Sequence, residues 1–536
     1  MDWRPASVAK WLFDSQSGPP GRLIPRWIVL RALGLIYFSA FFSLIFQIRG
    51  LIGPDGILPA GQYLQAVAAQ LGAARFWFAP TLLWFSSGSH MLMALCWIGL
   101  LASLLVVANV WPRATLAICF VCFLSFVSAA GDFSGYQSDG MLLEAGFISL
   151  FFAPPGLRPG WATASPASRA SWFLLQWEWL RIYFESGVAK IASGDPEWRH
   201  FTAMDNYYQN GPLPTWIGWY VQHLPHWFHA SSVYATLALE LGLVWMFLLP
   251  RRFRIILFFI VTPWEIGVIL TANYCFLNYL VLALGFLLLD DRFFAWWLPA
   301  KWKARISLRF PESAASHTEA AAEENSDSNR EMSPLNALRL SLTTVVLSWI
   351  FYATTAPLIW MFMPQFPLPT APVTALDPFR IANRYGLFAV MTRARYEIEF
   401  QGSEDGKNWV AYPFRFKPQD IYKPPGIYAP YQPRFDWNLW FASLGSWREY
   451  PIVPSTEERL LANDPDVLAL FAGNPFAKQA PKQVRAVLFQ YWFTTMAEKR
   501  ETGAWWRREY LGLYAPTLGH DANGKIEVEE WPAGRE

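Results

Sequence analysis

Charged side chains interrupt an apolar stretch that is long enough to cross a membrane. Glu178, Arg181, Glu185 and Lys190 lie within SWFLLQWEWLRIYFESGVAKI, residues 171–191. Residues three or four positions apart share a helix face, so the two glutamates and the arginine would point the same way. Because isolated charges in lipid are costly, this face must point into a helix bundle or a wet cavity. The cluster is either an ion-pair network that holds helices together or a site for acid–base chemistry.

A polar and aromatic loop, WRHFTAMDNYYQNGPLPTWIGWY at residues 198–220, holds a second group of titratable side chains. His200 and Asp205 could act there as acid and base, although a lone His beside an Asp is a weak signal for catalysis. The sequence has no nucleophile elbow, H-E-x-x-H, glycine-rich phosphate loop or carboxylate cluster with metal spacing. We therefore assign no catalytic residue and expect no cofactor and no metal. If the protein is an enzyme, the candidate catalytic groups are Glu178, Arg181, Glu185, His200 and Asp205.

Composition indicates a protein of the membrane. The chain of 536 residues is 54% hydrophobic and only 16% charged, with 30 Trp, whereas soluble domains are about 25% charged. The net charge of +2 gives no reason to expect a nucleic acid partner. Cys119 and Cys122 have the spacing of a redox dithiol, but their neighbours are purely apolar and would not stabilise a thiolate. We interpret them as inert helix thiols.

The apolar runs predict a helical membrane domain over residues 1–363 with about nine spans. The expected spans are approximately 27–48, 89–110, 113–130, 141–155, 171–191, 231–249, 255–272, 276–290 and 336–362. Basic residues occupy every second connection: Arg22 and Arg26, Arg113, Arg158 and Arg169, Arg251, Arg252 and Arg254, and Lys301, Lys303, Arg305 and Arg309. That alternation predicts a cytoplasmic N-terminus. An odd number of spans then places the C-terminal domain outside the cytosol.

Two segments differ from this pattern. Residues 311–334 are acidic and free of aromatics, which predicts a disordered cytoplasmic loop that can be deleted. Residues 364–536 predict a soluble, β-rich domain. Its strict alternation at 395–401, followed by the turn GSEDGKN, is typical of a hairpin in a half-exposed sheet. The turn resembles those of jelly-roll sandwiches, so we expect a fold of that kind. Helical spacing at 456–473 and 482–500 predicts a helical C-terminal part with a frayed polar tail.

Five blocks of the chain resemble the hallmark segments of the lipase maturation factor family. They are GYQSDGMLLEAGF at 135–147, FTAMDNYYQNGPLPTWIGWY at 201–220, NRYGLFAVMTRARYEIEFQGSEDGKNW at 383–409, APYQPRFDWNLWFASLG at 429–445 and GAWWRREYLGLY at 503–514. The resemblance implies a multi-span membrane protein with a large non-cytosolic C-terminal domain. Animal members of the family lie in the endoplasmic reticulum and help certain lipases to fold and assemble.

The resemblance implies a membrane-anchored folding or maturation factor for secreted hydrolases such as lipases. Its partners would be membrane lipid and an unfolded or assembling lipase-type client, whose identity and the oligomeric state stay open. The sequence lacks N-x-[ST] acceptors and ends in WPAGRE without a retention signal, so we expect a bacterial-type member in the inner (plasma) membrane. A weaker similarity in layout to the membrane half of vitamin-K-dependent carboxylases keeps an alternative open, an integral membrane enzyme that acts on a lipid, quinone or protein.

We expect the functional site to lie on the non-cytosolic face, where loops 49–87, 131–140 and 192–230 would meet the C-terminal domain. Polar and aromatic side chains at such a junction are typical of interface anchors. The residues expected at the client or domain interface are Asp132, Tyr136, Gln137, Asp139, Trp198, Asp205, Asn206, Tyr207, Tyr208, Arg380, Asn383, Tyr385, Arg393, Arg434, Asp436 and Trp437.

Overall fold

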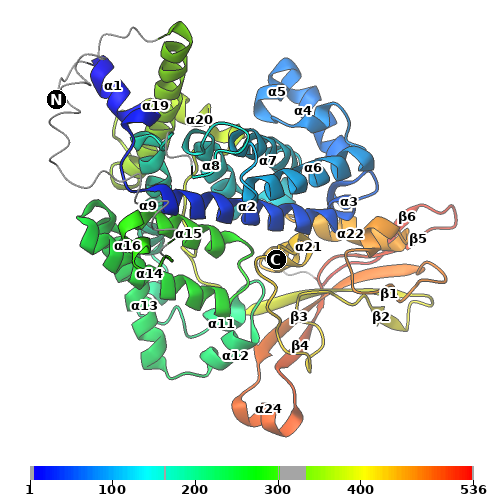
Figure 1. The fold of residues 1–536 in the computed structure, drawn as a ribbon. Coiled ribbons are helices and arrows are strands. Elements are labelled where there is room, and N and C mark those ends of the chain that lie inside the picture. Colours follow the sequence, from blue (N-terminus) through cyan, green and yellow to red (C-terminus); the bar gives the residue numbers. More distant parts are fainter. Residues whose placement is uncertain (1–4, 162–164, 300, 302–332, 534–536) are drawn as a thin grey trace, which may run out of the picture.

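The apolar runs fold as helices, since only a helix satisfies its own backbone groups within one segment in lipid. The computed structural model describes residues 5–161, 165–299, 301 and 333–533. The helices of its bundle, drawn in Figure 1, are α2 (Leu23–Ile45), α6 (Ser89–Val107), α7 (Pro112–Val127), α8 (Gln137–Phe152), α9 (Arg169–Ala192), α13 (His226–Leu241), α14 (Arg251–Thr271), α15 (Leu277–Gly285) and α19 (Pro334–Phe362). Each predicted span coincides with one of these helices.

Length and apolarity separate these helices into groups. Among the described residues, five helices are long and apolar enough to cross a membrane: α2, α6, α13 with the 3-10 turn that follows it, α14 and α19. Helices α7 and α15 are apolar but shorter, and α8 and α9 carry buried charges. The chain is therefore an integral membrane protein, but the expected number of spans is not confirmed. The acidic loop predicted at 311–334 lies outside the described residues except for Ser333, which caps α19, and Pro334, its first residue.

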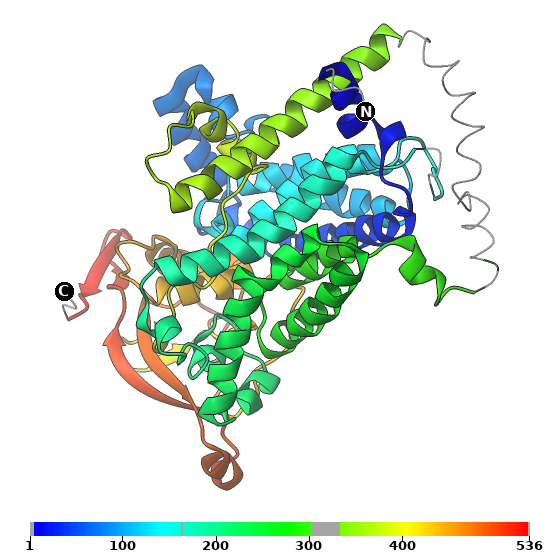
Figure 2. The same cartoon turned by 90° about the vertical axis from the view of Figure 1, so that its left-hand side faces the viewer.

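The C-terminal part contains one six-stranded antiparallel sheet in the order β2-β1-β3-β5-β6, with β4 also paired to β3. The strands are β1 (Arg395–Ser403), β2 (Trp409–Ala411), β3 (Gln483–Phe493), β4 (Trp506–Leu513), β5 (Thr517–His520) and β6 (Ile526–Glu530). Helices α21 (Arg434–Ala442), α22 (Ile452–Leu461), α23 (Pro465–Leu468) and α24 (Met496–Thr502) accompany it. Figure 2 shows this sheet and the N-terminus at opposite ends of the helix bundle.

The predicted hairpin is confirmed, because Gln401 pairs with Ala411 and Ser403 with Trp409 on either side of the turn. The prediction of a half-exposed sheet is wrong at this strand. Glu397 and Glu399 are buried, and the carboxylate of Glu397 pairs with Arg395 and, at 2.8 Å, with Lys417. A jelly roll needs two packed sheets. The described residues form one, so the jelly-roll prediction is not confirmed.

The helix predicted at 482–500 is wrong over its first half, which is β3. This strand pairs with β1 along nine residues and with β4 on its other edge, and most of its residues on both faces are buried. A strand covered on both faces shows a nearly continuous apolar run, which periodicity cannot tell from a buried helix. The prediction of a frayed, helical tail is wrong as well, since the chain after α24 forms β4, β5 and β6. Helix at 456–473 is confirmed in part by α22 and α23.

The pH dependence of folding tests the interior of the C-terminal part. Asp436 is buried on α21 and accepts backbone hydrogen bonds from Phe416 at 3.2 Å and Lys417 at 3.1 Å. Loss of solvent, only partly offset by these bonds, raises the pKa of Asp436 from 3.8 to about 6. The native state then holds a proton that the unfolded state has lost. Stability should therefore fall as pH rises from about 4 to above 6, by up to about 3 kcal/mol.

Asp436→Asn should flatten this fall, because an amide oxygen accepts the same bonds without titrating. Denaturant unfolding of the full chain between pH 4 and 7 measures the effect. The control is Asp405→Asn in the exposed β1–β2 turn, where bonds from the Asn408 and Lys407 amides lower the pKa of Asp405. Its contribution has the opposite sign, since it is lost as pH falls. An unchanged slope in Asp436→Asn would show that Asp436 does not cause this pH dependence.

Candidate functional site

An extended segment at 380–394 links the two parts of the chain, and buried side chains of the membrane helices bind its backbone. Glu144 of α8 accepts hydrogen bonds from the Asn383 backbone at 2.9 Å and from the Tyr385 hydroxyl at 2.9 Å. Glu185 of α9 accepts a bond from the Tyr385 backbone at 2.7 Å. These carboxylates are fully buried, so charge-assisted bonds to the segment replace their lost hydration.

The charged face of α9 points into the bundle, as predicted. Its partners are not the neighbouring glutamates of the same helix. Arg181 forms an ion pair with Glu144 of α8 and donates to the Asn383 carbonyl at 2.8 Å. Glu178 lies fully buried one turn away. The face therefore joins two helices and the segment 380–394.

The same segment is held further along by the end of α9 and the loop after it. Lys190 forms an ion pair with Glu240 of α13 at 2.9 Å and donates to the Leu387 carbonyl at 3.0 Å. Trp198 donates to the Phe388 carbonyl at 3.0 Å, and Asp195 accepts from the Met391 backbone at 2.6 Å. Bonds spaced along the chain in this way fix the path of the segment.

A bidentate ion pair joins α21 of the C-terminal part to α8 of the bundle. The Arg434 guanidinium contacts both Asp139 oxygens, at 2.7 and 2.8 Å, and donates to the Phe133 carbonyl at 2.7 Å. Both charged side chains are fully buried. Gln47, at the end of α2, accepts from the Arg434 backbone at 2.8 Å and donates to the Gln432 carbonyl at 2.9 Å. The Arg434–Asp139 contact is therefore a fully buried ion pair between the two parts.

Further contacts connect the remaining loops to the sheet. Arg395 at the start of β1 donates to the carbonyls of Gln209 and Pro212, both at 3.0 Å. His223, at the end of α12 (Trp216–Gln222), lies 2.9 Å from the Thr494 carbonyl. Asn273, just after α14, accepts from the Tyr428 backbone at 2.6 Å. The loops at this end of the bundle therefore contact the C-terminal part at many points.

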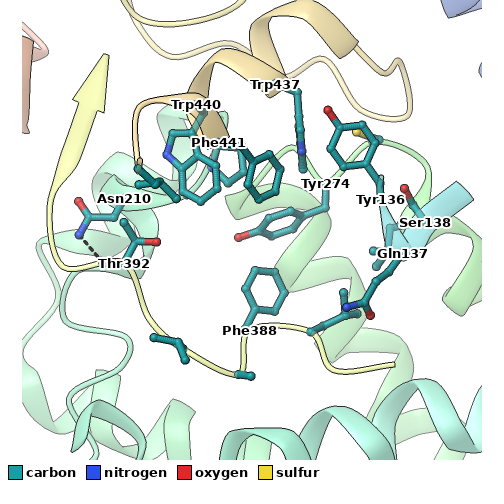
Figure 3. Close-up of a pocket in the computed structure, with 18 of the residues that line it drawn as sticks. Tyr136, Gln137, Ser138, Asn210, Tyr274, Phe388, Thr392, Trp437, Trp440 and Phe441 are labelled. Atoms are coloured by element: carbon teal, nitrogen blue, oxygen red, sulfur yellow. Dashed lines mark hydrogen bonds between the residues drawn. The ribbon is translucent and has the colours of Figure 1, made fainter. Parts of the chain in front are cut away.

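These contacts enclose a cavity of about 400 Å³ (Figure 3). Its walls come from residues 135–138, 207–212, 274–277, 386–392 and 432–444, so both parts of the chain build it. The aromatic side chains that line it are Tyr136, Tyr207, Tyr274, Phe388, Trp437, Trp440 and Phe441. No Asp, Glu, Lys, Arg or His lines it among the described residues. The cavity suits an uncharged ligand with apolar groups.

The expected catalytic groups do not come together as one site. Asp205 bonds to the exposed His226 at 3.0 Å instead of to His200. His200 is exposed on the loop, while Glu178, Arg181 and Glu185 lie inside the bundle. Within the part of the chain that the structure describes, no three His, Cys, Asp or Glu side chains converge as a metal site would require.

Most of the residues expected at the interface lie at the junction. Those in its contacts or cavity walls are Tyr136, Gln137, Asp139, Trp198, Tyr207, Asn383, Tyr385, Arg434 and Trp437. Tyr208 is buried in the neighbouring loop core. Exposed side chains are Asp132, Asn206, Arg380 and Arg393, the last 3.8 Å from Asp195 and Glu197. The prediction that Asp436 lies at the interface is wrong, because its side chain points into the C-terminal part.

Sequence reasoning missed three residues that make important contacts, namely Glu144, Gln47 and Arg395. Glu144 is the only acid in the apolar run MLLEAGF. Charge within an apolar run was the signal that identified Glu178 and its neighbours, and it would have found Glu144 as well. Gln47 and Arg395 had no such signal, because a polar residue next to a loop is ordinary.

This architecture, a bundle of apolar helices with a folded sheet domain fixed to its loops, defines a polytopic membrane protein with a large extramembrane domain. The family model of the lipase maturation factor transmembrane domain matches residues 24–296, and that of the lipase maturation factor C-terminal domain matches residues 381–516. The chain belongs to the lipase maturation factor family.

Curated relatives match along nearly the whole chain. Lipase maturation factor 2 of Gallus gallus is 31% identical over 93% of this chain and 82% of its own length. Lipase maturation factor 1 of Bos taurus is 29% identical over 96% of this chain and 94% of its own length. Lipase maturation factor 2 of Homo sapiens is 29% identical over 93% of this chain and 83% of its own length. No solved structure matches significantly. These relatives give no support to the alternative of an integral membrane enzyme.

Removing one partner of the buried pair tests the junction. Arg434→Met leaves Asp139 charged and buried, which should lower the free energy of unfolding by about 3–5 kcal/mol. Adding Asp139→Leu should restore part of the loss, because no charge is then left unpaired. Thermal unfolding of the full chain in detergent measures both. The control is Arg507→Met, since Arg507 and Glu498 are exposed partners at 3.5 Å. Equal effects of Arg434→Met and Arg507→Met would contradict the assignment.

Proposed function

We propose that this protein is a membrane-anchored folding or maturation factor for secreted hydrolases such as lipases. The observation that carries the proposal is the match to relatives named lipase maturation factors, 31% identical over 93% of this chain in one case. The buried charges are consistent with this role. Arg181, Glu144 and Glu185 all bind each other or the segment 380–394, so they serve to position that segment.

We propose a membrane domain at 1–363 with a cytoplasmic N-terminus and a C-terminal domain at 364–536 outside the cytosol, in a bacterial plasma membrane. The positions of basic residues support this orientation. Arg26 donates to the Phe152 carbonyl at 2.8 Å, Arg113 to the Ala153 carbonyl at 2.7 Å, and Arg22 to the Leu289 carbonyl at 2.6 Å. Basic residues from separate connections thus gather at one end of the bundle, as expected of a cytoplasmic end.

The client surface is proposed to lie where the loops and the C-terminal domain meet. A folding factor binds apolar surface that a client exposes before it is folded, and the junction offers an aromatic cavity next to exposed apolar side chains. We propose that Tyr136, Gln137, Arg434 and Trp437, all expected at the interface, lie in or next to this surface.

Co-expression with a secreted lipase tests the function. We expect the specific activity of the secreted lipase, its activity per amount of protein, to rise several-fold when the full chain is present. A folding factor increases the fraction of active molecules without changing the enzyme itself. Arg434→Met should remove the effect, and Arg507→Met should retain it. An unchanged specific activity for a panel of lipases would contradict the proposal.

Substitutions that remove the charge of a carboxylate but keep its shape separate a folding factor from an enzyme. Asp205→Asn should keep nearly all of the effect on the lipase, because a folding factor does not depend on one acid–base group. An enzyme loses activity by orders of magnitude when such a group is removed. Glu185→Gln is judged by the same assay, with thermal unfolding as a check on folding. Loss of function in either variant, with normal expression and stability, would reject the folding-factor account.

A further inference from the structure

The cavity between α21 and the segment 386–392 has polar atoms that no part of the described chain satisfies. The indole nitrogens of Trp437 and Trp440 and the side-chain amide of Gln432 are buried and have no hydrogen-bond partner there. Their side chains are at most 8% exposed, and all three line the cavity. Buried polar groups without partners are costly and are rare in native proteins. A ligand that accepts hydrogen bonds would relieve this cost.

Aromatic rings in contact with one another form a large part of the remaining lining. Tyr274 lies 5.0 Å from Phe388 and 6.0 Å from Trp437, and Tyr136 lies 6.0 Å from Trp437 and 5.9 Å from Phe441, as distances between ring centres. Figure 3 shows the two tryptophans on the α21 side of the cavity, opposite Phe388. A flat apolar group can pack here against several ring faces.

The described residues that line the cavity include no charged side chain, and this narrows the chemical class of the ligand. Phosphates and carboxylates need cations or several convergent donors. An alkylammonium group can lie against aromatic rings without a carboxylate, but it offers no acceptor to the unpartnered N–H groups. Uncharged N–H donors between aromatic rings suit a ligand that alternates apolar groups with carbonyl oxygens. An extended peptide has this pattern of apolar side chains and carbonyl oxygens. Its carbonyls can accept hydrogen bonds from the cavity only while the peptide is unfolded, since folding pairs them internally.

The entrance and the wall favour such a ligand as well. Val390 is 69% exposed and Leu444 is 43% exposed, so the rim is apolar and open. The wall formed by 386–391 is held from behind by Lys190, Trp198 and Asp195. A site formed in advance binds without the cost of ordering itself.

We infer that this cavity binds a large aromatic side chain on an extended, uncharged segment of an unfolded client, with its neighbouring carbonyls bonded to Trp437, Trp440 and Gln432. The inference rests on the proposed function and names the chemistry that this function recognises.

Two dye-labelled neutral peptides, identical except for a central Trp or Ser, test the inference by fluorescence anisotropy with the full chain in nanodiscs. The Trp peptide should bind at least about 10-fold more tightly than the Ser peptide. Val390→Asp at the rim should weaken its binding by at least about 10-fold. Trp440→Phe keeps the ring shape but removes the N–H, so it should cost about 3- to 10-fold. The matched control is Val410→Asp, an exposed position on β2 that is not among the residues lining the cavity, which should change nothing.

Equal binding of the two peptides, or equal effects of Val390→Asp and Val410→Asp, would overturn the inference. Displacement of the Trp peptide by a monoacylglycerol that binds more tightly would assign the cavity to a neutral lipid and overturn it too. The lipase assay separates this result from the proposed function. Peptide binding without a rise in lipase activity rejects the function alone. A rise that survives Val390→Asp rejects the cavity as the client site and leaves the function standing.

Discussion

The buried ion pair between Arg434 and Asp139 is the contact on which the position of the C-terminal part depends. Neither side chain is exposed to solvent, and an unpaired charge at this depth would be strongly destabilising. Arg434 can therefore lie only where Asp139 and the Phe133 carbonyl receive its donors. Such a pair adds little net stability compared with apolar packing, but it specifies one arrangement. We regard that specificity as the reason for charges in so apolar a bundle.

The other buried charges have the same role at different points. Glu144 and Glu185 bind the backbone at 383–385, and Lys190 binds the Leu387 carbonyl. The segment between the two parts is thereby fixed along its length. The aromatic cavity follows from this arrangement, because one wall is the fixed segment and the other is α21. Loss of either set of contacts would open the cavity as well as loosen the domain.

Sequence reasoning succeeded where a pattern is local. The apolar runs located the helices of the bundle, and the alternation at 395–401 with its turn located the β1–β2 hairpin. The charges at 178–185 were placed on an inward face because lipid would not tolerate them. Reasoning failed where pairing decides the outcome. Residues 483–493 form a central strand because β1 and β4 cover its edges, and those partners are not visible in the run itself.

The junction could be anticipated only as a set of residues. Arg181 was expected on one inward face with Glu178 and Glu185, but its ion-pair partner, Glu144, is distant in the sequence. Arg434 and Asp139 were both expected at the interface, but nothing in the sequence joined them into a pair. Pairing across hundreds of residues depends on the path of the chain between them, which local periodicity does not contain.

The central claim is that buried polar contacts hold the C-terminal part on the membrane helices as one unit. A protease site placed in the exposed stretch near Phe366 allows the chain to be cut between the two parts after it has folded. We predict that the C-terminal fragment stays bound through purification and unfolds together with the helices, and that Arg434→Met releases it. Rapid release of an intact fragment from the unmodified protein, with no change in the stability of the membrane part, would contradict the account.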